Sequence, residues 1–277
     1  MSSTRDDRGI YIGTSGWNYK HWRGVVYPAD LKQQDWLGYL ARIVNTLEIN
    51  SSFYRIPSGE TLTHWLEAIP SRVRLASKLW RGITHFRKLN NVEDFLRSYF
   101  DIFQAIPPRQ RGPVLVQLPP QQHKDLEKLD RFLSQVRDIR PGNWKIAVEF
   151  RHDSWLSADV CKLLDRHRAA LCLHDRTGQG AATAPNQADF VYLRRHGPHH
   201  GDYTGSYSLD ALQADSYKIR QWARGGQTVY VYFNNDADGH AFRNAQTLQG
   251  LCDSCASPEA KQNRPAGVSP VDTGGIR

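Results

Sequence analysis

Residues 144–150 read WKIAVEF and are followed by RHDSW. An apolar run of this length, rich in Ile, Val and aromatic residues, is typical of a buried β-strand. The run ends near Glu149, and Arg151 stands two positions further on. Because residues two apart on a strand point to the same face, the segment predicts a strand that presents a carboxylate and a guanidinium together at its carboxyl end.

Seven further apolar runs of the same kind occur along the chain. We predict strands at 10–15, 44–50, 73–79, 113–119, 144–150, 169–175, 189–196 and 227–235. Segments with a helical pattern follow at 31–42, 59–68, 92–105, 125–138, 156–167, 209–224 and 239–251. The segment 176–188 is rich in Gly and Ala, so the helix after strand six is expected to be weak or missing. Eight alternating units predict an α/β fold, a single (β/α)8 barrel of the TIM type.

Length and composition agree with one domain. The chain has 277 residues, which suits a barrel of ~250 residues. We expect a disordered N-terminus at 1–9, the barrel at 10–252 and a disordered C-terminal tail at 253–277. No apolar stretch approaches the ~20 residues of a membrane span, and the polar N-terminus does not resemble a secretory signal. We therefore expect a cytoplasmic protein that does not bind membranes.

Four cysteines are too few for a disulfide framework in a chain of this length. Cys252 and Cys255 form a lone CxxC without the second ligand pair that a zinc site needs. Its role is left open.

The chain carries a net charge of +8, from 36 basic and 28 acidic residues. Charges balance within 1–8 and within 253–277, so the excess belongs to the predicted barrel. A basic body favours an anionic partner, either a small phosphorylated or carboxylated molecule or a nucleic acid. Solubility alone explains the excess equally well.

Polar residues stand at or just past the end of nearly every predicted strand, where barrels of this type place their active sites. The catalytic candidates are Glu48, Glu149, Lys78 and Arg151. The substrate-binding candidates are Asn50, Gln117, Asp175, Arg194, His196, Asn234, Asn235 and Trp17. Such a ring offers a general acid, a general base and cationic groups within one cavity. The alternative interpretation is a structural network of ion pairs at the barrel top.

Two of these groups allow more than one chemistry. A buried Lys78 amine with a lowered pKa can attack a carbonyl, but pairing with Glu48 would raise that pKa, so we expect Lys78 to bind a substrate anion. Glu149, Asp175 and His196, with Asn235 or Asp236, contain metal-ligating groups. Two guanidinium groups on the same faces would repel a cation, so no metal and no other cofactor is predicted, and a divalent ion is a minor alternative.

Five separated segments, in this order and spacing, resemble the YecE-like family, also called domain of unknown function seventy-two. They are IGTSGWNYKHWRG (12–24), NTLEINSSFYRIP (45–57), VQLPP (116–120), AVEFRHDSW (147–155) and VYVYFNNDADG (229–239). The resemblance runs from about Ile10 to Leu251 and leaves the CxxC outside the family pattern. It implies a TIM-type barrel and no particular activity.

We expect an enzyme that binds a small anionic substrate, phosphorylated or sugar-like, at the mouth of the barrel. Glu48 and Glu149 would carry out acid–base chemistry, while Lys78, Arg151 and Arg194 hold the anion. One alternative is a nucleic-acid-binding protein or barrel nuclease, and another is a non-catalytic sensor or scaffold. The reaction and the oligomeric state are left open.

Overall fold

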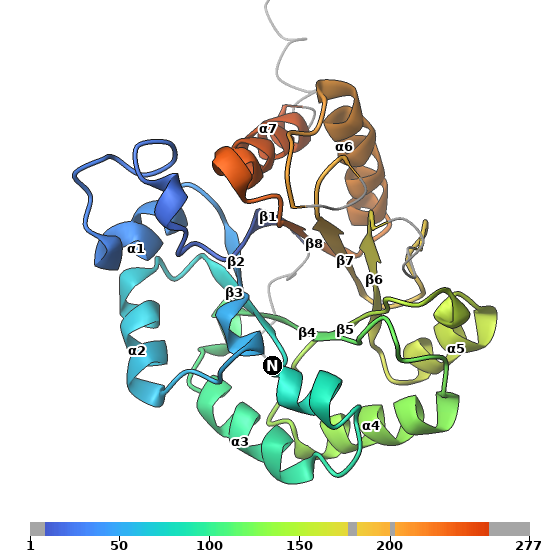
Figure 1. Cartoon of the computed structure of the whole chain (residues 1–277). Helices are drawn as coiled ribbons and strands as arrows, with labels where there is room; N and C mark the ends of the chain where they lie inside the picture. Colours follow the sequence, from blue (N-terminus) through green and yellow to red (C-terminus); the bar gives the residue numbers. More distant parts are fainter. Residues whose placement is uncertain (1–8, 177–181, 200–202, 255–277) are drawn as a thin grey trace, which may run out of the picture.

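A closed barrel of eight parallel strands forms the centre of the molecule. The computed structural model describes residues 9–176, 182–199 and 203–254. Each strand pairs with the next in chain order, and β8 pairs with β1 to close the sheet. Helices surround the barrel on its outside (Figure 1). The predicted (β/α)8 fold is confirmed. The terminal segments 1–8 and 255–277, which make up most of the predicted disordered ends, lie outside the described residues.

The elements follow the predicted order, and every strand lies within two residues of its predicted bounds. The strands are β1 (Ile10–Ser15), β2 (Thr46–Ile49), β3 (Arg74–Lys78), β4 (Arg111–Gln117), β5 (Ile146–Glu149), β6 (Ala170–His174), β7 (Phe190–Arg195) and β8 (Thr228–Phe233). The helices are α1 (Trp36–Ala41), α2 (Gly59–Ala68), α3 (Glu93–Phe103), α4 (Leu126–Ile139), α5 (Ala158–Arg166), α6 (Leu209–Arg224) and α7 (His240–Asp253). No helix occurs between β6 and β7 in the described residues 175–176 and 182–189, as predicted.

Two apolar cores hold the elements together. The larger core lies between the outer face of the barrel and the helices, and the outward residues of the strands are mostly Val, Leu and Ile. α3 contributes Leu96, Tyr99, Phe100 and Phe103, which recur at the helical period on one face. The smaller core fills the barrel interior with Ala, Leu, Cys, Phe and Tyr side chains, among them Ala147, Cys172, Tyr192 and Tyr232. The interior is therefore filled by these side chains toward the amino ends of the strands. Polar residues occupy the upper end, where the strands reach their carboxyl ends.

Gly13 permits the close approach of β1 and β2. A Cβ atom at this position would lie 1.8 Å from the carbonyl oxygen of Thr46. We expect Gly13→Ala to lower the free energy of unfolding by about 2 kcal/mol or more, because an overpacked site forces the backbone to move. Urea denaturation measures this change. Gly59→Ala, whose new methyl group meets nothing within 4 Å, is the matched control and should be neutral or slightly stabilising. Equal unfolding midpoints for Gly13→Ala and wild type would contradict the expectation.

No helix in the described part of the chain is long and apolar enough to cross a bilayer.

Candidate functional site

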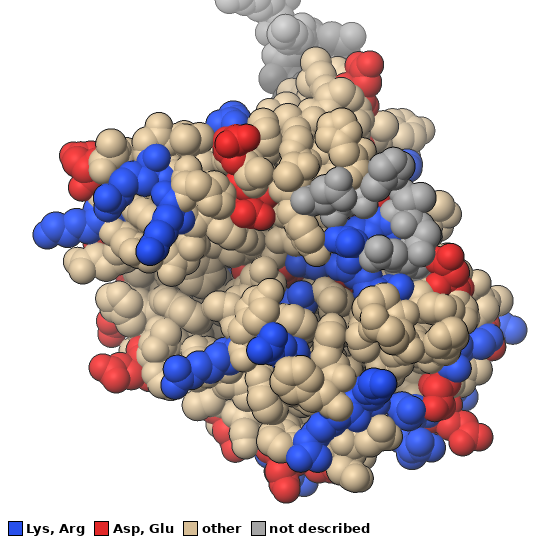
Figure 2. Space-filling model, in the orientation of Figure 1, with Lys and Arg blue, Asp and Glu red and all other residues tan. Residues whose placement is uncertain are grey.

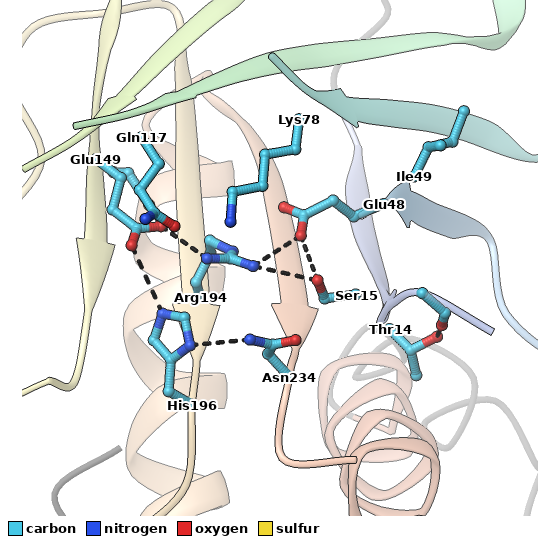
Figure 3. A network of polar contacts seen from close by, with 12 residues as sticks. Thr14, Ser15, Glu48, Ile49, Lys78, Gln117, Glu149, Arg194, His196 and Asn234 are labelled. Carbon is cyan, nitrogen blue, oxygen red and sulfur yellow. Dashed lines mark hydrogen bonds and ion pairs between the residues drawn. The ribbon is translucent and has the colours of Figure 1, made fainter. Parts of the chain in front are cut away.

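Arg194 lies at the centre of the polar cluster inside the upper barrel. It projects inward from β7 and is fully buried. Its Nη2 donates a hydrogen bond to Glu48 Oε1 at 2.8 Å, and its Nη1 donates to Glu149 Oε2 at 2.8 Å. The guanidinium therefore joins the carboxylates of β2 and β5 across the barrel (Figure 3).

The Glu48 carboxylate is held by two further groups. The Ser15 hydroxyl, at the end of β1, donates to Oε1, and the Tyr192 hydroxyl donates to Oε2 at 2.5 Å. We refer to Ser15, Glu48, Glu149, Tyr192 and Arg194 as the enclosed cluster, since none of them is more than 1% exposed. Such a dense set of charge-assisted hydrogen bonds offsets the cost of removing these charges from water.

A second layer lies nearer to solvent. Lys78, Arg151 and Asn234, which we call the upper residues, retain 6–7% exposure. Arg151 forms an ion pair with Glu149 Oε1, and its Nη2 lies 3.4 Å from both Gln117 Oε1 and His196 Nε2. His196 Nδ1 in turn lies 3.1 Å from Asn234 Nδ2. Lys and Arg side chains lie in the middle of the face shown in Figure 2.

The protonation states of the buried groups follow from their neighbours. Burial raises the pKa of Glu149, but Arg151 and Arg194 outweigh this and hold the pKa well below its usual range. Burial, reinforced by Arg194, places the pKa of His196 well below its usual value. At neutral pH the site therefore contains an ionised Glu149 and an uncharged His196 imidazole.

Lys78 differs from the two arginines because no carboxylate of the described residues pairs with it. Its side chain extends toward Arg194 between Glu48 and Glu149 (Figure 3), yet in the described part of the chain no ion pair reaches its Nζ within 4 Å. The Phe53 ring centroid lies 3.9 Å from Nζ. Burial and then Arg194 lower the pKa of Lys78 from 10.5 to about 7, and the two carboxylates only partly offset this. The pairing with Glu48 considered from the sequence is not formed.

A short π-helix, Gly82–Phe86, follows β3 and brings His85 to the same side of the mouth. Its imidazole packs edge-on against Phe53 at 4.9 Å between ring centroids. Burial, followed by the charges of Lys78 and Arg151, lowers the pKa of His85 to about 4. π-Helices occur frequently at functional sites, and here one borders the unpaired amine.

Asp175 and Asn235, which were predicted to bind substrate, instead form hydrogen bonds with neighbouring loop and helix residues. Asp175 Oδ1 accepts a hydrogen bond from the His196 backbone at 2.9 Å, and its Oδ2 accepts one from the Tyr207 hydroxyl. Asn235 Nδ2 donates to Gly205 O at 2.8 Å and to Asn244 Oδ1 at 2.9 Å. These contacts connect the ends of β6 and β8 with the segment after β7. Among the described residues, the Asp175 carboxylate thus makes no hydrogen bond or ion pair with the side chains of Glu149 or His196, and no group of three side chains is arranged to hold a metal ion.

Trp17 and Asn50 line a separate pocket beside the cluster, with a volume of about 360 Å³. The other lining residues are Gly16, Asn18, Tyr19, Ser51, Tyr54 and Trp65. Trp17 meets Trp65 edge to face at 5.2 Å between ring centroids. The pocket adjoins the ends of β1 and β2, whereas a hollow of about 620 Å³ between α4 and α5 contains no strand-end residue.

The sequence interpretation missed three residues of the site. His174 is buried at the end of β6, where its Nε2 lies 2.9 Å from Phe150 O. It shares a face with Cys172, which lies in the interior core, so the two-residue alternation indicates His174 rather than Asp175. Tyr192 stands two residues before Arg194 and is found by the same rule. His85 has no such signal, because its position depends on the π-helix.

One known protein family matches most of the chain. The family described as "Protein of unknown function DUF72" matches residues 11–266. The chain belongs to this family. The resemblance to YecE-like proteins is thereby confirmed. The expected extent was too narrow, however, because the DUF72 match continues past Leu251 and includes Cys252 and Cys255.

Individual relatives agree with this assignment. The UPF0759 protein YunF of Bacillus subtilis is 23% identical over 272 residues, which cover 88% of this chain and 95% of YunF. The UPF0759 protein YecE of Escherichia coli is 27% identical over 149 residues, which cover 53% of this chain and 50% of YecE.

Solved DUF72 structures have the same fold. One from Thermotoga maritima superposes with a TM-score of 0.79 at 24% identity, covering 88% of this chain and 99% of the other. One from Enterococcus faecalis gives 0.72 at 18% identity, covering 90% and 99%.

Proposed function

We propose that this protein is an enzyme that binds a small anionic substrate, phosphorylated or sugar-like, at the C-terminal mouth of the barrel. The charge balance of the site supports this most strongly. Among the enclosed cluster and the upper residues, all in the described part of the chain, three cations (Lys78, Arg151 and Arg194) accompany two carboxylates, Glu48 and Glu149. A protonated Lys78 therefore has no counter-charge, and burying an unpaired charge is costly. An anionic ligand removes this cost.

Exposure indicates which groups meet the ligand. The enclosed cluster is out of reach of solvent, whereas Lys78, Arg151 and Asn234 are not. We assign these upper residues to contact with the anion, and Gln117 and His196 to holding Arg151 in place. The neighbouring pocket with Trp17 and its aromatic walls offers space and stacking surface for the rest of the ligand.

Lys78 is the group best suited to move protons. A catalytic acid or base works best when its pKa is near the operating pH, and the pKa of Lys78 is about 7. Glu149, whose pKa is held well below its usual range, is a weak base and stays ionised. We therefore assign proton transfer to Lys78. The carboxylates Glu48 and Glu149, for which acid–base chemistry was predicted, are assigned to positioning the two arginines.

Thermal denaturation in the presence of anions tests this proposal. Inorganic phosphate, sugar phosphates and small carboxylic acids are expected to raise the Tm of the wild-type protein. A ligand at a hundredfold excess over its Kd contributes about 2.7 kcal/mol. Lys78→Met and Arg151→Met should lose this response. Lys128→Met, which removes a partly exposed lysine of α4, is the matched control and should keep it.

The proposal fails if no anion stabilises the wild-type protein, or if both mouth variants respond as it does. Short oligonucleotides form a separate arm. Equal stabilisation of all variants by oligonucleotides, weakening steeply with salt, would favour the alternative of a nucleic-acid-binding surface.

A further inference from the structure

We propose that Lys78 is a nucleophile that forms an imine with a small carbonyl compound carrying a carboxylate or a phosphate group. This inference rests on the proposed function, because Arg151 would hold the anionic group while the Lys78 amine, which lies beside that group and gives up its own proton, attacks the carbonyl carbon. It goes further by naming the reacting atom, Lys78 Nζ, and the class of substrate.

The lysine is held in a fixed position from its backbone outward. Ser52, which follows β2, accepts a hydrogen bond from Lys78 N at 3.1 Å and lies 2.7 Å from Lys78 O, to which its hydroxyl donates. The side chain is 7% exposed, and its amine lies over the Phe53 ring. The backbone is thus held by hydrogen bonds and the side chain is confined by burial before any ligand arrives, which favours nucleophilic catalysis.

The two nearby carboxylates are engaged elsewhere. Glu48 binds Arg194, Ser15 and Tyr192, and Glu149 binds Arg194 and Arg151. A lysine that serves only to balance charge would pair with one of them. Instead both carboxylates bind arginines, and no described residue forms an ion pair with the lysine amine. This arrangement leaves the nitrogen lone pair available whenever the amine is uncharged.

An uncharged amine is the reactive form, and the surroundings favour it. Burial and the Arg194 charge give Lys78 a pKa of about 7, so a large fraction of the amine is neutral at physiological pH. An exposed lysine is almost entirely protonated under the same conditions.

The reaction balances without an additional reagent. The Lys78 ammonium first loses one proton. The neutral amine then forms a bond from Nζ to the carbonyl carbon while one of its remaining protons moves to the carbonyl oxygen, which gives a carbinolamine. The proton lost at first returns to the hydroxyl group, which leaves as water, and a protonated C=N bond remains. Overall, one ammonium group and one carbonyl group give one iminium group and one water molecule. The iminium then withdraws electrons from the neighbouring carbon of the substrate.

Reductive trapping on the full chain tests this inference. The protein is incubated with pyruvate, with dihydroxyacetone phosphate, or with acetone as the uncharged control, and then treated with sodium borohydride. Intact mass and peptide mapping locate the adduct. We expect one adduct, at Lys78, with at least one of the two anionic probes. The amount of adduct formed with acetone should be lower by a factor of about ten or more. A factor of ten corresponds to the loss of one charge-assisted contact. The two anionic probes show whether a carboxylate or a phosphate is recognised.

Three variants make the outcomes distinct. Lys78→Met and Lys78→Arg should both lose the adduct, while Lys128→Met keeps it. Lys78→Arg retains a positive charge and should still be stabilised by inorganic phosphate. If phosphate stabilises the wild-type protein but no adduct forms at Lys78, the imine is overturned and anion binding stands. If neither occurs, both proposals fail. Adducts spread over many lysines, or unchanged labelling of Lys78→Met, would also overturn the imine.

Discussion

Replacing Arg194 with Met is expected to lower the free energy of unfolding by about 3 to 5 kcal/mol. The reason is that Glu48 and Glu149 are fully buried and both bind this guanidinium. Removing Arg194 leaves two carboxylates facing each other in a medium that solvates them poorly. Urea denaturation at neutral pH, followed by circular dichroism, measures the loss.

Two further variants make the result specific. Arg137→Met removes an arginine whose side chain is 57% exposed and ion-paired with Asp138, and it should change stability by less than about 1 kcal/mol. A triple variant, Arg194→Met with Glu48→Gln and Glu149→Gln, removes all three charges together and should recover part of the loss. If Arg194→Met alone is as stable as Arg137→Met, the enclosed cluster does not depend on its arginine.

Lys78→Met is expected to stabilise the protein at neutral pH, in contrast to the loss at Arg194. In the unfolded chain the amine loses its proton near its ordinary pKa of 10.5, whereas in the folded protein the pKa is about 7. Between these values the unfolded chain binds more protons, so stability rises as the pH rises through this window. Below about pH 7 both states are protonated, and the whole cost of burying the cation is present. That cost is on the order of 5 kcal/mol, because the pKa falls from 10.5 to about 7 and each tenfold change in proton affinity is worth about 1.4 kcal/mol.

Urea denaturation of both proteins over the range from about pH 6 to about pH 10 tests the linkage. The difference between wild type and Lys78→Met isolates this one group, because the other titrating side chains are common to both. We expect the variant to be more stable at low pH and the difference to shrink steadily toward high pH. A difference that stays constant with pH would show that Lys78 retains its ordinary pKa, and a variant that is less stable than wild type at pH 7 would contradict the expected stabilisation.

The sequence predicted the fold well because each unit carries local signals. Apolar runs of strand length alternate with segments such as 92–105, whose apolar residues recur at the helical period. Side-chain caps agree with these bounds, for example Ser58 before α2 and Ser208 before α6. The start of α1 was placed too early, because Gln33–Asp35 forms a separate 3-10 turn.

The site was predicted less well for a physical reason. Barrel strands are buried on both faces, so hydrophobicity does not alternate cleanly and does not show which face points inward. On β6 this led to Asp175, whereas Cys172 and His174 share the inner face. The identity of the charged residues was visible in the sequence. Which carboxylate pairs with which cation depends on the geometry of the closed barrel. In that geometry Glu48, the partner considered for Lys78, binds Arg194 instead.

The bridge made by Arg194 has a consequence for how the protein acquires its site. Arg194 and Glu48 are separated by 146 residues in the chain and meet only after the last strands have joined the first. Contacts of such long sequence separation form late, because the chain must lose much of its freedom before they can be made. A half-barrel of β1 to β4 would contain Glu48 and Lys78 but neither arginine. An anion that binds at the mouth would therefore bind only the chain in which all eight strands have closed the barrel. Anion binding would then distinguish the completely folded protein from a half-folded one.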